Sequence, residues 1–96
     1  MLTWFIYDIT SDKARTKIAK LALRCGLYRV QKSVFLGQAD HSRVDEIVIQ
    51  SEQLIDPATD SLYVFPMCEK DFKSVVLKGQ AFDKAMVNDE IKALFL

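Results

Sequence analysis

Hydrophobic and polar positions along the chain follow periods that switch between strand-like and helix-like. Residues 2–7 are continuously apolar, rich in strand formers and followed by a polar cluster, so this run predicts a buried β-strand and a turn. Apolar side chains then recur at helical spacing from Ala14 to Cys25. Gly26 comes next, at a position where the end of a helix favours glycine. The first part of the chain therefore predicts a strand followed by an amphipathic helix.

Residues 28–36 alternate in the manner of a strand, except that Lys32 falls among the apolar positions. This break predicts two short strands joined by a tight turn or a bulge near Lys32 and Ser33. Residues 44–55 carry a second apolar stripe at helical spacing, and residues 62–67 predict a further strand. The order of elements is therefore βαββαβ.

Two polar residues stand before each predicted helix as candidate N-caps: Ser11 or Asp12 for the first, and Asp40 or Ser42 for the second. The element order predicts one domain over residues 1–96, with two helices on one face of a four-stranded antiparallel sheet. An additional strand is expected at residues 74–78, before an apolar C-terminal tail at about residues 82–96.

The strands predicted at residues 2–7 and 62–67 are apolar at both odd and even positions, so both faces of their sheet are apolar. Two helices cover one face only, and the other face would expose aromatic side chains to water. We therefore expect a two-fold homodimer in which this second face meets its copy. The apolar tail can add a strand to an exposed edge of the partner subunit.

A net charge of zero conceals an uneven distribution of charge. The 96 residues are half hydrophobic and about a quarter charged, as in an ordinary globular domain. Residues 1–36 carry a net charge of +5, residues 37–60 carry −5, and the remaining residues balance. Solvated helix faces explain such asymmetry without any ligand, and a phosphate-binding surface explains it as well.

The N-terminal apolar run is too short for a signal peptide or a membrane span and has no basic residues before it. We therefore expect a cytoplasmic protein with no membrane partner. Cys25 and Cys68 show no metal-binding spacing, and His41 is the chain's only histidine. This pattern indicates neither a zinc site nor a disulfide framework. His41 is expected to be a solvated surface residue rather than a general base.

Asp8 ends the first strand beside the basic helix and is the candidate metal ligand. Mg²⁺ prefers oxygen ligands and is often held by one or two carboxylates together with substrate phosphates. Two Asp8 side chains brought together across a dimer axis would make a better site than one. The alternative interpretation is that Asp8 only stabilises a turn or caps a helix.

The chain resembles the CRISPR-associated protein 2 family in three features taken together. These are Tyr7-Asp8-Ile9 at a strand end, Arg15 in the helix that follows, and the run from Arg29 to Phe35 about 20 residues after the helix begins. The likeness extends in length and element order through residues 62–67. It implies an α+β ferredoxin-like homodimer that works in CRISPR spacer acquisition.

The resemblance also implies roles for individual residues. Asp8 would be the catalytic residue and would hold a divalent metal, Mg²⁺. Phe35 would support the site, and Tyr7 and Ser33 are candidates to hold a phosphate or a metal-bound water. The family's nucleic-acid contacts match Arg15, Lys17 and Arg29, and the basic face of the predicted helix adds Lys13 and Lys20. Lys17 departs from the arginine that is also usual at its position, and lysine makes no bidentate phosphate contact.

Three classes of function stay open. The first is a Mg²⁺-dependent endonuclease that cuts RNA or DNA, and the second is a non-catalytic bridge between CRISPR integrase subunits that holds duplex DNA. The third is a ligand-sensing regulatory module, since this fold hosts many functions. The basic first third and the absence of a glycine-rich loop favour the first two. The aromatic-glycine motif of RNA-recognition domains is absent, so Phe5, Tyr7 and Tyr63 are expected in the core and the interface rather than as a base-stacking platform.

Overall fold

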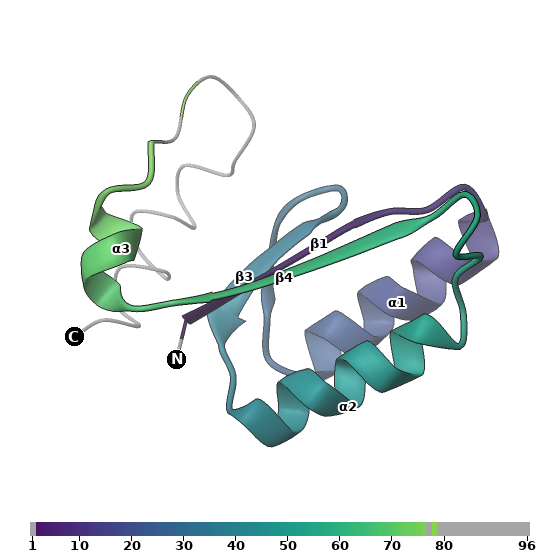
Figure 1. Cartoon of the computed structure of the whole chain (residues 1–96), viewed down its shortest axis with the longest axis horizontal. Helices are drawn as coiled ribbons and strands as arrows, with labels where there is room; N and C mark the ends of the chain where they lie inside the picture. The colour runs from purple at the N-terminus through teal and green to yellow at the C-terminus, as the bar shows by residue number, and fades with distance from the viewer. Residues whose placement is uncertain (1, 77, 79–96) are drawn as a thin grey trace.

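The computed structural model describes residues 2–76 and 78. Four strands form one sheet in the order β2-β3-β1-β4, and each neighbouring pair is antiparallel. Helices α1 (Asp12–Arg24) and α2 (His41–Glu52) lie side by side across one face of this sheet (Figure 1). The strands are β1 (Leu2–Asp8), β2 (Tyr28–Gln31), β3 (Val34–Gln38) and β4 (Ser61–Met67). This is the α+β ferredoxin-like arrangement that the sequence predicted.

Both ends of α1 are fixed by local chemistry. The Ser11 hydroxyl accepts a hydrogen bond from the Ala14 N–H at 3.2 Å, which identifies Ser11 as the N-cap. Gly26 follows the helix with φ of 85°, a left-handed conformation that favours glycine. The Leu27 N–H then returns to the Ala22 carbonyl at 3.2 Å and closes a Schellman motif.

The second helix and the hairpin also follow the sequence pattern. The Asp40 carboxylate caps α2 by accepting from the Arg43 N–H at 2.8 Å. Lys32 and Ser33 form the turn between β2 and β3, and the register of this pair shifts between Arg29 and Gln31. The expected tight turn and bulge are therefore confirmed.

The main core lies on the face of the sheet beneath α1 and α2, which we call the helix-covered face. Phe5 and Tyr7 from β1 and Phe35 from β3 pack there with Ile18 of α1 and Ile47 of α2. These five side chains are at most 3% exposed. Burying a large apolar side chain contributes about 1.5–3 kcal/mol, so this cluster supplies much of the stability.

The opposite face of the sheet, which we call the outer face, is covered in part by the chain itself. Leu2, Trp4 and Leu36 are buried there, and Phe72 and Val75 pack against them. Phe72 belongs to the short helix α3 (Glu69–Lys73), which the sequence analysis did not predict. This segment returns over the sheet and covers part of the outer face, and the other described residues leave the remainder uncovered.

That remainder lies on β4. Tyr63 and Phe65 are 50% and 48% exposed, and their rings stack with centroids 6.2 Å apart. Their cross-strand partners are Ile6 and Trp4, so all four positions belong to the outer face. An exposed aromatic pair on an edge strand is the surface that we expected a second copy to cover.

The expected strand at residues 74–78 is not found in the described part of that segment. Ser74 is the C-cap of α3, and residues 75, 76 and 78 take no regular structure. Phe72 and Val75 instead pack on the outer face, next to the short helix that replaces the expected strand. The tail at residues 82–96 and its expected pairing lie outside the described residues. Among the described helices, none combines the length and apolar character needed to cross a membrane.

Candidate nucleic-acid interface

A wide groove of about 1050 Å³ separates α1 from the β2–β3 hairpin. We call it the hairpin groove. Five of its lining residues are among the candidates from sequence: Tyr7, Arg15, Lys20, Arg29 and Ser33. Lys32 adds a further cation and Asp12 an acid. The fold therefore brings together side chains that lie up to 26 positions apart in the sequence, around an opening of positive character.

Tyr7 forms the inner wall of the hairpin groove. Its ring stacks on Phe35 with centroids 6.1 Å apart, and its backbone N–H donates to the Ser33 carbonyl at 3.1 Å. Tyr7 is only 3% exposed, and the Arg29 side chain is the hydrogen-bonding group beside its buried hydroxyl. Burial raises the pKa of the Tyr7 hydroxyl, and the nearby Arg29 and Arg15 charges oppose this shift. The hydroxyl is therefore protonated at neutral pH, and it is enclosed behind the groove wall.

Arg29 is held by its own hairpin turn. Its Nε and Nη2 atoms donate to the Lys32 carbonyl at 3.1 and 2.7 Å. Its guanidinium also lies over the Phe35 ring, 5.4 Å from the centroid. This geometry explains the supporting role expected of Phe35, because the ring and the turn together fix the direction of the charge.

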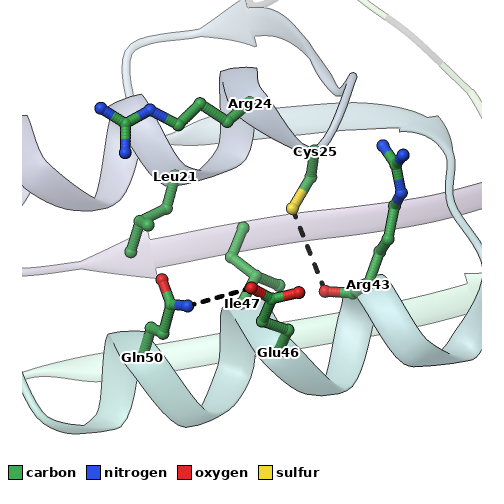
Figure 2. A pocket seen from close by; sticks show the side chains of 7 residues that line it. All are labelled: Leu21, Arg24, Cys25, Arg43, Glu46, Ile47 and Gln50. Carbon is green, nitrogen blue, oxygen red and sulfur yellow. Dashed lines mark hydrogen bonds between the residues drawn. The ribbon is translucent and has the colours of Figure 1, made fainter.

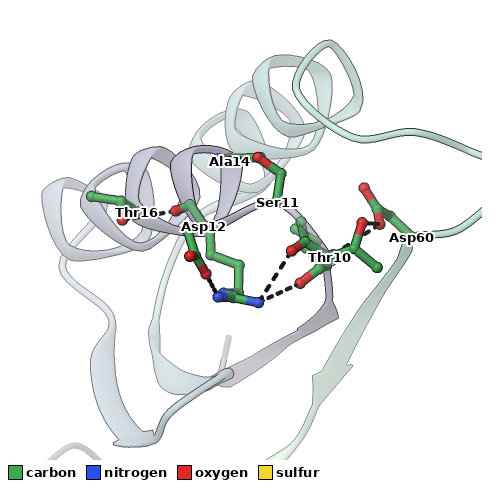
Figure 3. Close-up of polar contacts among 8 residues, drawn as sticks. Thr10, Ser11, Asp12, Ala14, Thr16 and Asp60 are labelled. Atoms are coloured by element: carbon green, nitrogen blue, oxygen red, sulfur yellow. Dashed lines mark hydrogen bonds and ion pairs between the residues drawn. The ribbon is translucent and has the colours of Figure 1, made fainter.

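Arg15 is held by the loop that leads into its helix. Its Nη1 atom donates to the Ile9 carbonyl at 2.9 Å and to the Thr10 carbonyl at 3.5 Å. Its Nη2 atom forms an ion pair with Asp12 in the first turn of α1 (Figure 3). Part of the hydrogen-bonding capacity of Arg15 is therefore spent within the protein, which the sequence did not indicate.

A second groove runs between α1 and α2 on the side away from the sheet, and we call it the helix groove. Figure 2 shows one end of it, which is lined by Arg24 of α1, by Cys25 at the C-cap of α1, and by Arg43, Glu46 and Gln50 of α2; the Cys25 thiol points to the Arg43 carbonyl. The adjoining end is lined by the candidates Lys17 and Lys20 together with Arg24, Gln50 and Leu54. The two ends have volumes of about 340 and 350 Å³.

Lys20 lines both grooves, and the cations of the helix groove differ from Arg15 and Arg29 in having no partner within the described residues. Within residues 2–76 and 78, the side chains of Lys17, Lys20, Arg24 and Arg43 form no ion pair or hydrogen bond. Sequence analysis missed Arg24 and Arg43. Arg24 continues the basic helical stripe and could have been included on that ground, whereas nothing in the pattern places Arg43 opposite it. Lys13 lines neither groove, so the structure separates it from the other candidates.

Asp8 stands at the end of β1, exposed and opposite Ser61 of β4. Successive strand residues point to opposite faces, so Asp8 shares the outer face with Ile6 and Trp4, while Tyr7 belongs to the helix-covered face. Asp8 accordingly does not line the hairpin groove. One chain thus presents its carboxylate and its arginines on different sides of the sheet.

Asp8 has few neighbouring side chains in the described part of the chain that could share a metal ion with it. Among the residues that the structure describes, no three His, Cys, Asp or Glu side chains lie close enough to hold a metal. Asp8 offers a single exposed carboxylate, and His41 is exposed at the start of α2. Such a position suits Mg²⁺ only when substrate phosphates or a second carboxylate complete its coordination.

Comparison with known proteins identifies the family. The family model described as CRISPR associated protein Cas2 matches residues 1–75 of the chain. The chain belongs to the Cas2 family. A relative from Korarchaeum cryptofilum, named CRISPR-associated endoribonuclease Cas2, is 38% identical over 71 residues. The matched region covers 71% of this chain and 73% of that protein. A Cas2 endoribonuclease from Desulforudis audaxviator is 33% identical over 76% of this chain and 69% of its own length.

Solved structures agree with this assignment to Cas2. Streptococcus pyogenes Cas2 superposes with a TM-score of 0.70 at 27% identity, covering 82% of this chain and all of that one. A hypothetical protein from Thermus thermophilus gives a TM-score of 0.64 at 33% identity, over 70% of this chain and 80% of that one. The family match over residues 1–75 includes the strand end at Asp8 and the elements that line the hairpin groove.

Proposed function

We propose that this chain is a CRISPR-associated endonuclease that binds RNA or DNA as a homodimer and cuts its phosphodiester backbone at Asp8 with Mg²⁺. Family membership supports the nuclease class, because the Cas2 relatives above carry the name endoribonuclease. The observation that carries the proposal is the position of Asp8. It is an exposed carboxylate at a strand end, on the face that holds the half-exposed Tyr63 and Phe65.

The homodimer in this proposal is formed by the outer faces of two subunits. A two-fold axis pairs a patch with itself, so Tyr63 and Phe65 would lie against the same residues of the second copy. Asp8 follows Ile6 on that face, and each subunit would thus contribute one Asp8 close to the interface. Two carboxylates and the phosphates of a bound strand together satisfy the preferences of Mg²⁺.

The proposed tasks are divided between two surfaces: Asp8 lies on the outer face, and Arg15 and Arg29 lie in the hairpin groove. Asp8 holds the metal, which when bound supplies Lewis acidity and lowers the pKa of a coordinated water. Arg29 and Arg15 bind phosphates, each from a position fixed by backbone carbonyls. The Tyr7 ring stacks on Phe35, the ring over which the Arg29 guanidinium lies, and so supports the groove wall behind the phosphate-binding arginine. Because the contacts go to the backbone of the nucleic acid, binding is independent of its sequence.

A second function is favoured by the helix groove. Its unpaired cations, Lys17, Lys20, Arg24 and Arg43, form a surface suited to hold duplex phosphates without any cleavage. In this role the dimer is a scaffold in the cytoplasm that bridges CRISPR integrase subunits during spacer acquisition. The same protein can serve both functions. Cleavage requires the charge of Asp8, whereas duplex binding does not.

The experiment that separates the two functions compares Asp8→Asn with the unchanged protein in three assays. Asp8→Asn keeps the side-chain volume and removes the negative charge, so Mg²⁺-dependent cleavage falls by about 10²-fold or more. Binding of duplex DNA persists or tightens, because a negative charge near phosphates has been removed. Integration of a spacer with the integrase partner survives if the protein is only a scaffold.

Preparations free of contaminating nuclease are essential to this comparison, and an Asp45→Asn variant provides the control. Asp45 is an exposed acid in α2 that lines neither groove. It should cleave like the unchanged protein. Intact metal-dependent cleavage by Asp8→Asn would show that Asp8 is not the catalytic residue.

A further inference from the structure

The Asp60 carboxylate, which comes from a distant part of the chain, forms hydrogen bonds with the loop between Asp8 and Arg15. Asp60 stands just before β4, next to the last rung of the β1–β4 ladder, where Asp8 pairs with Ser61. Its Oδ1 atom accepts from the Thr10 N–H at 3.1 Å and from the Thr10 hydroxyl at 3.2 Å. The Asp60 side chain thus continues the tie between the two strand ends after the backbone ladder stops (Figure 3).

Asp60 is itself fixed in position by its own loop. Its Oδ2 atom accepts from the Asp56 N–H at 2.9 Å, and its Oδ1 atom accepts from the Thr59 hydroxyl at 3.1 Å. Hydrogen bonds from the Asp56 and Thr10 N–H groups lower the pKa of Asp60, so it is a carboxylate at neutral pH. A charged acceptor with four donors defines the place of Thr10 more firmly than a neutral one would.

The far side of the same loop holds Arg15. The carbonyls of Ile9 and Thr10 accept from Arg15 Nη1. The Ile9–Thr10 peptide group therefore makes both contacts: its N–H donates to Asp60, and its carbonyl accepts from Arg15 at 2.9 Å. The chain of contacts runs from Asp60 through Thr10 to Arg15. Asp8 lies two residues before Thr10 at the start of this loop.

We propose that Asp60 is a positioning residue of the site: through Thr10 it fixes the loop that sets both the Asp8 strand end and the Arg15 guanidinium. The inference rests on the proposed nuclease function for its catalytic consequence, but its geometric part can be measured independently. Asp60 touches neither reacting atom nor substrate in this account. Its effect on cleavage passes through the placement of the groups that do.

The test compares Asp60→Asn with Asp56→Asn. An asparagine at position 60 has one acceptor oxygen and an NH₂ group that cannot accept from the Asp56 or Thr10 N–H groups. Asp56→Asn is the matched control. This substitution removes the same charge from the same loop. In the unchanged protein the Asp56 carboxylate accepts from the Ala58 N–H at 2.9 Å and does not contact Thr10. Thermal melting confirms that both variants are folded at the assay temperature.

Two readouts are taken on each variant. The Arg15 Nε–Hε signal and the Thr10 amide signal in ¹⁵N NMR report the loop directly, and both should move in Asp60→Asn and stay in Asp56→Asn. In cleavage, Asp60→Asn should lose about 10- to 100-fold in kcat with little change in KM, the cost of a misplaced catalytic group. Thr10→Val should share the loss in part, and Thr10→Ser, which keeps the hydroxyl, should restore it.

The two readouts keep this inference distinct from the proposed function. If the unchanged protein does not cleave, the nuclease proposal fails, and a shifted Arg15 signal in Asp60→Asn still supports the positioning role. An Arg15 signal and a kcat unchanged by Asp60→Asn would overturn the inference, whichever way the nuclease proposal stands. Equal losses in Asp60→Asn and Asp56→Asn would overturn it as well, because loop charge alone would then be responsible.

Discussion

The two faces of the sheet differ in how completely one chain covers them. Beneath α1 and α2, Phe5 and Phe35 are at most 1% exposed, and the cluster around them is finished within the chain. On the outer face Trp4 is buried beside Phe72, but Phe65 remains 48% exposed on the edge strand. The first face accounts for folding. The second face is covered only in part and also carries Asp8. In the proposed dimer, the surface that joins the subunits is therefore the surface that carries the metal-binding carboxylate.

The largest effect is expected from a charge on the helix-covered face. Phe5→Asp places a carboxylate in a position that is 1% exposed, with no partner to compensate it. A loss above about 4 kcal/mol is a large share of the stability of a domain of this size, so the protein should be mostly unfolded. Far-UV circular dichroism at 25 °C checks this. A cooperative native melt for Phe5→Asp would contradict the assigned core.

The same substitution on the outer face should act on assembly instead. Phe65→Asp changes a half-exposed side chain, so the subunit stays folded and loses less than about 1 kcal/mol of stability. In a two-fold dimer the charge appears twice at the interface, and the dissociation constant should rise by about 30-fold or more. Light scattering across a dilution series measures this change. Lys78→Asp, an exposed position outside the strands, is the control.

The contrast between Phe5 and Phe65 could be predicted only in part from the sequence. Alternation along residues 2–7 and 62–67 predicted two apolar faces, because strand periodicity is local information. The caps Ser11 and Asp40 and the turn at Gly26 were predictable for the same reason. Which face the chain would cover by itself was not predictable. Residues 69–73 have Phe72 as their one apolar side chain, and only tertiary contact reveals where it packs.

The candidate site divides in the same way. Tyr7, Arg15 and Arg29 were named from motifs, and the hairpin groove brings them together. The carbonyl partners of both arginines depend on loop geometry and left no trace in residue types. Asp60 stayed unnoticed among several acids for this reason. Asp8 does not line this groove within a single chain, because strand alternation puts Asp8 and Tyr7 on opposite faces.

A smaller effect is expected where α3 covers the outer face. Phe72→Ala removes the ring that packs 6.2 Å from Trp4 and should cost about 1–3 kcal/mol. The melting temperature should fall by roughly 4–8 °C per kcal/mol while the protein stays folded at 25 °C. Lys73→Ala provides the control, since it breaks only the exposed ion pair in which Lys73 Nζ lies 3.4 Å from Glu69 Oε1. Equal melting temperatures for Phe72→Ala and Lys73→Ala would show that α3 does not stabilise this face.

The claim that the outer face joins two subunits is tested most directly by sedimentation equilibrium of the unchanged protein at micromolar concentration. The account predicts a species of about 22 kDa, twice the 11.0 kDa of one chain. That mass should be independent of salt between low and high ionic strength, because the interface is apolar. A single species of about 11 kDa at these concentrations would contradict the account. It would leave each Asp8 carboxylate alone on its own subunit.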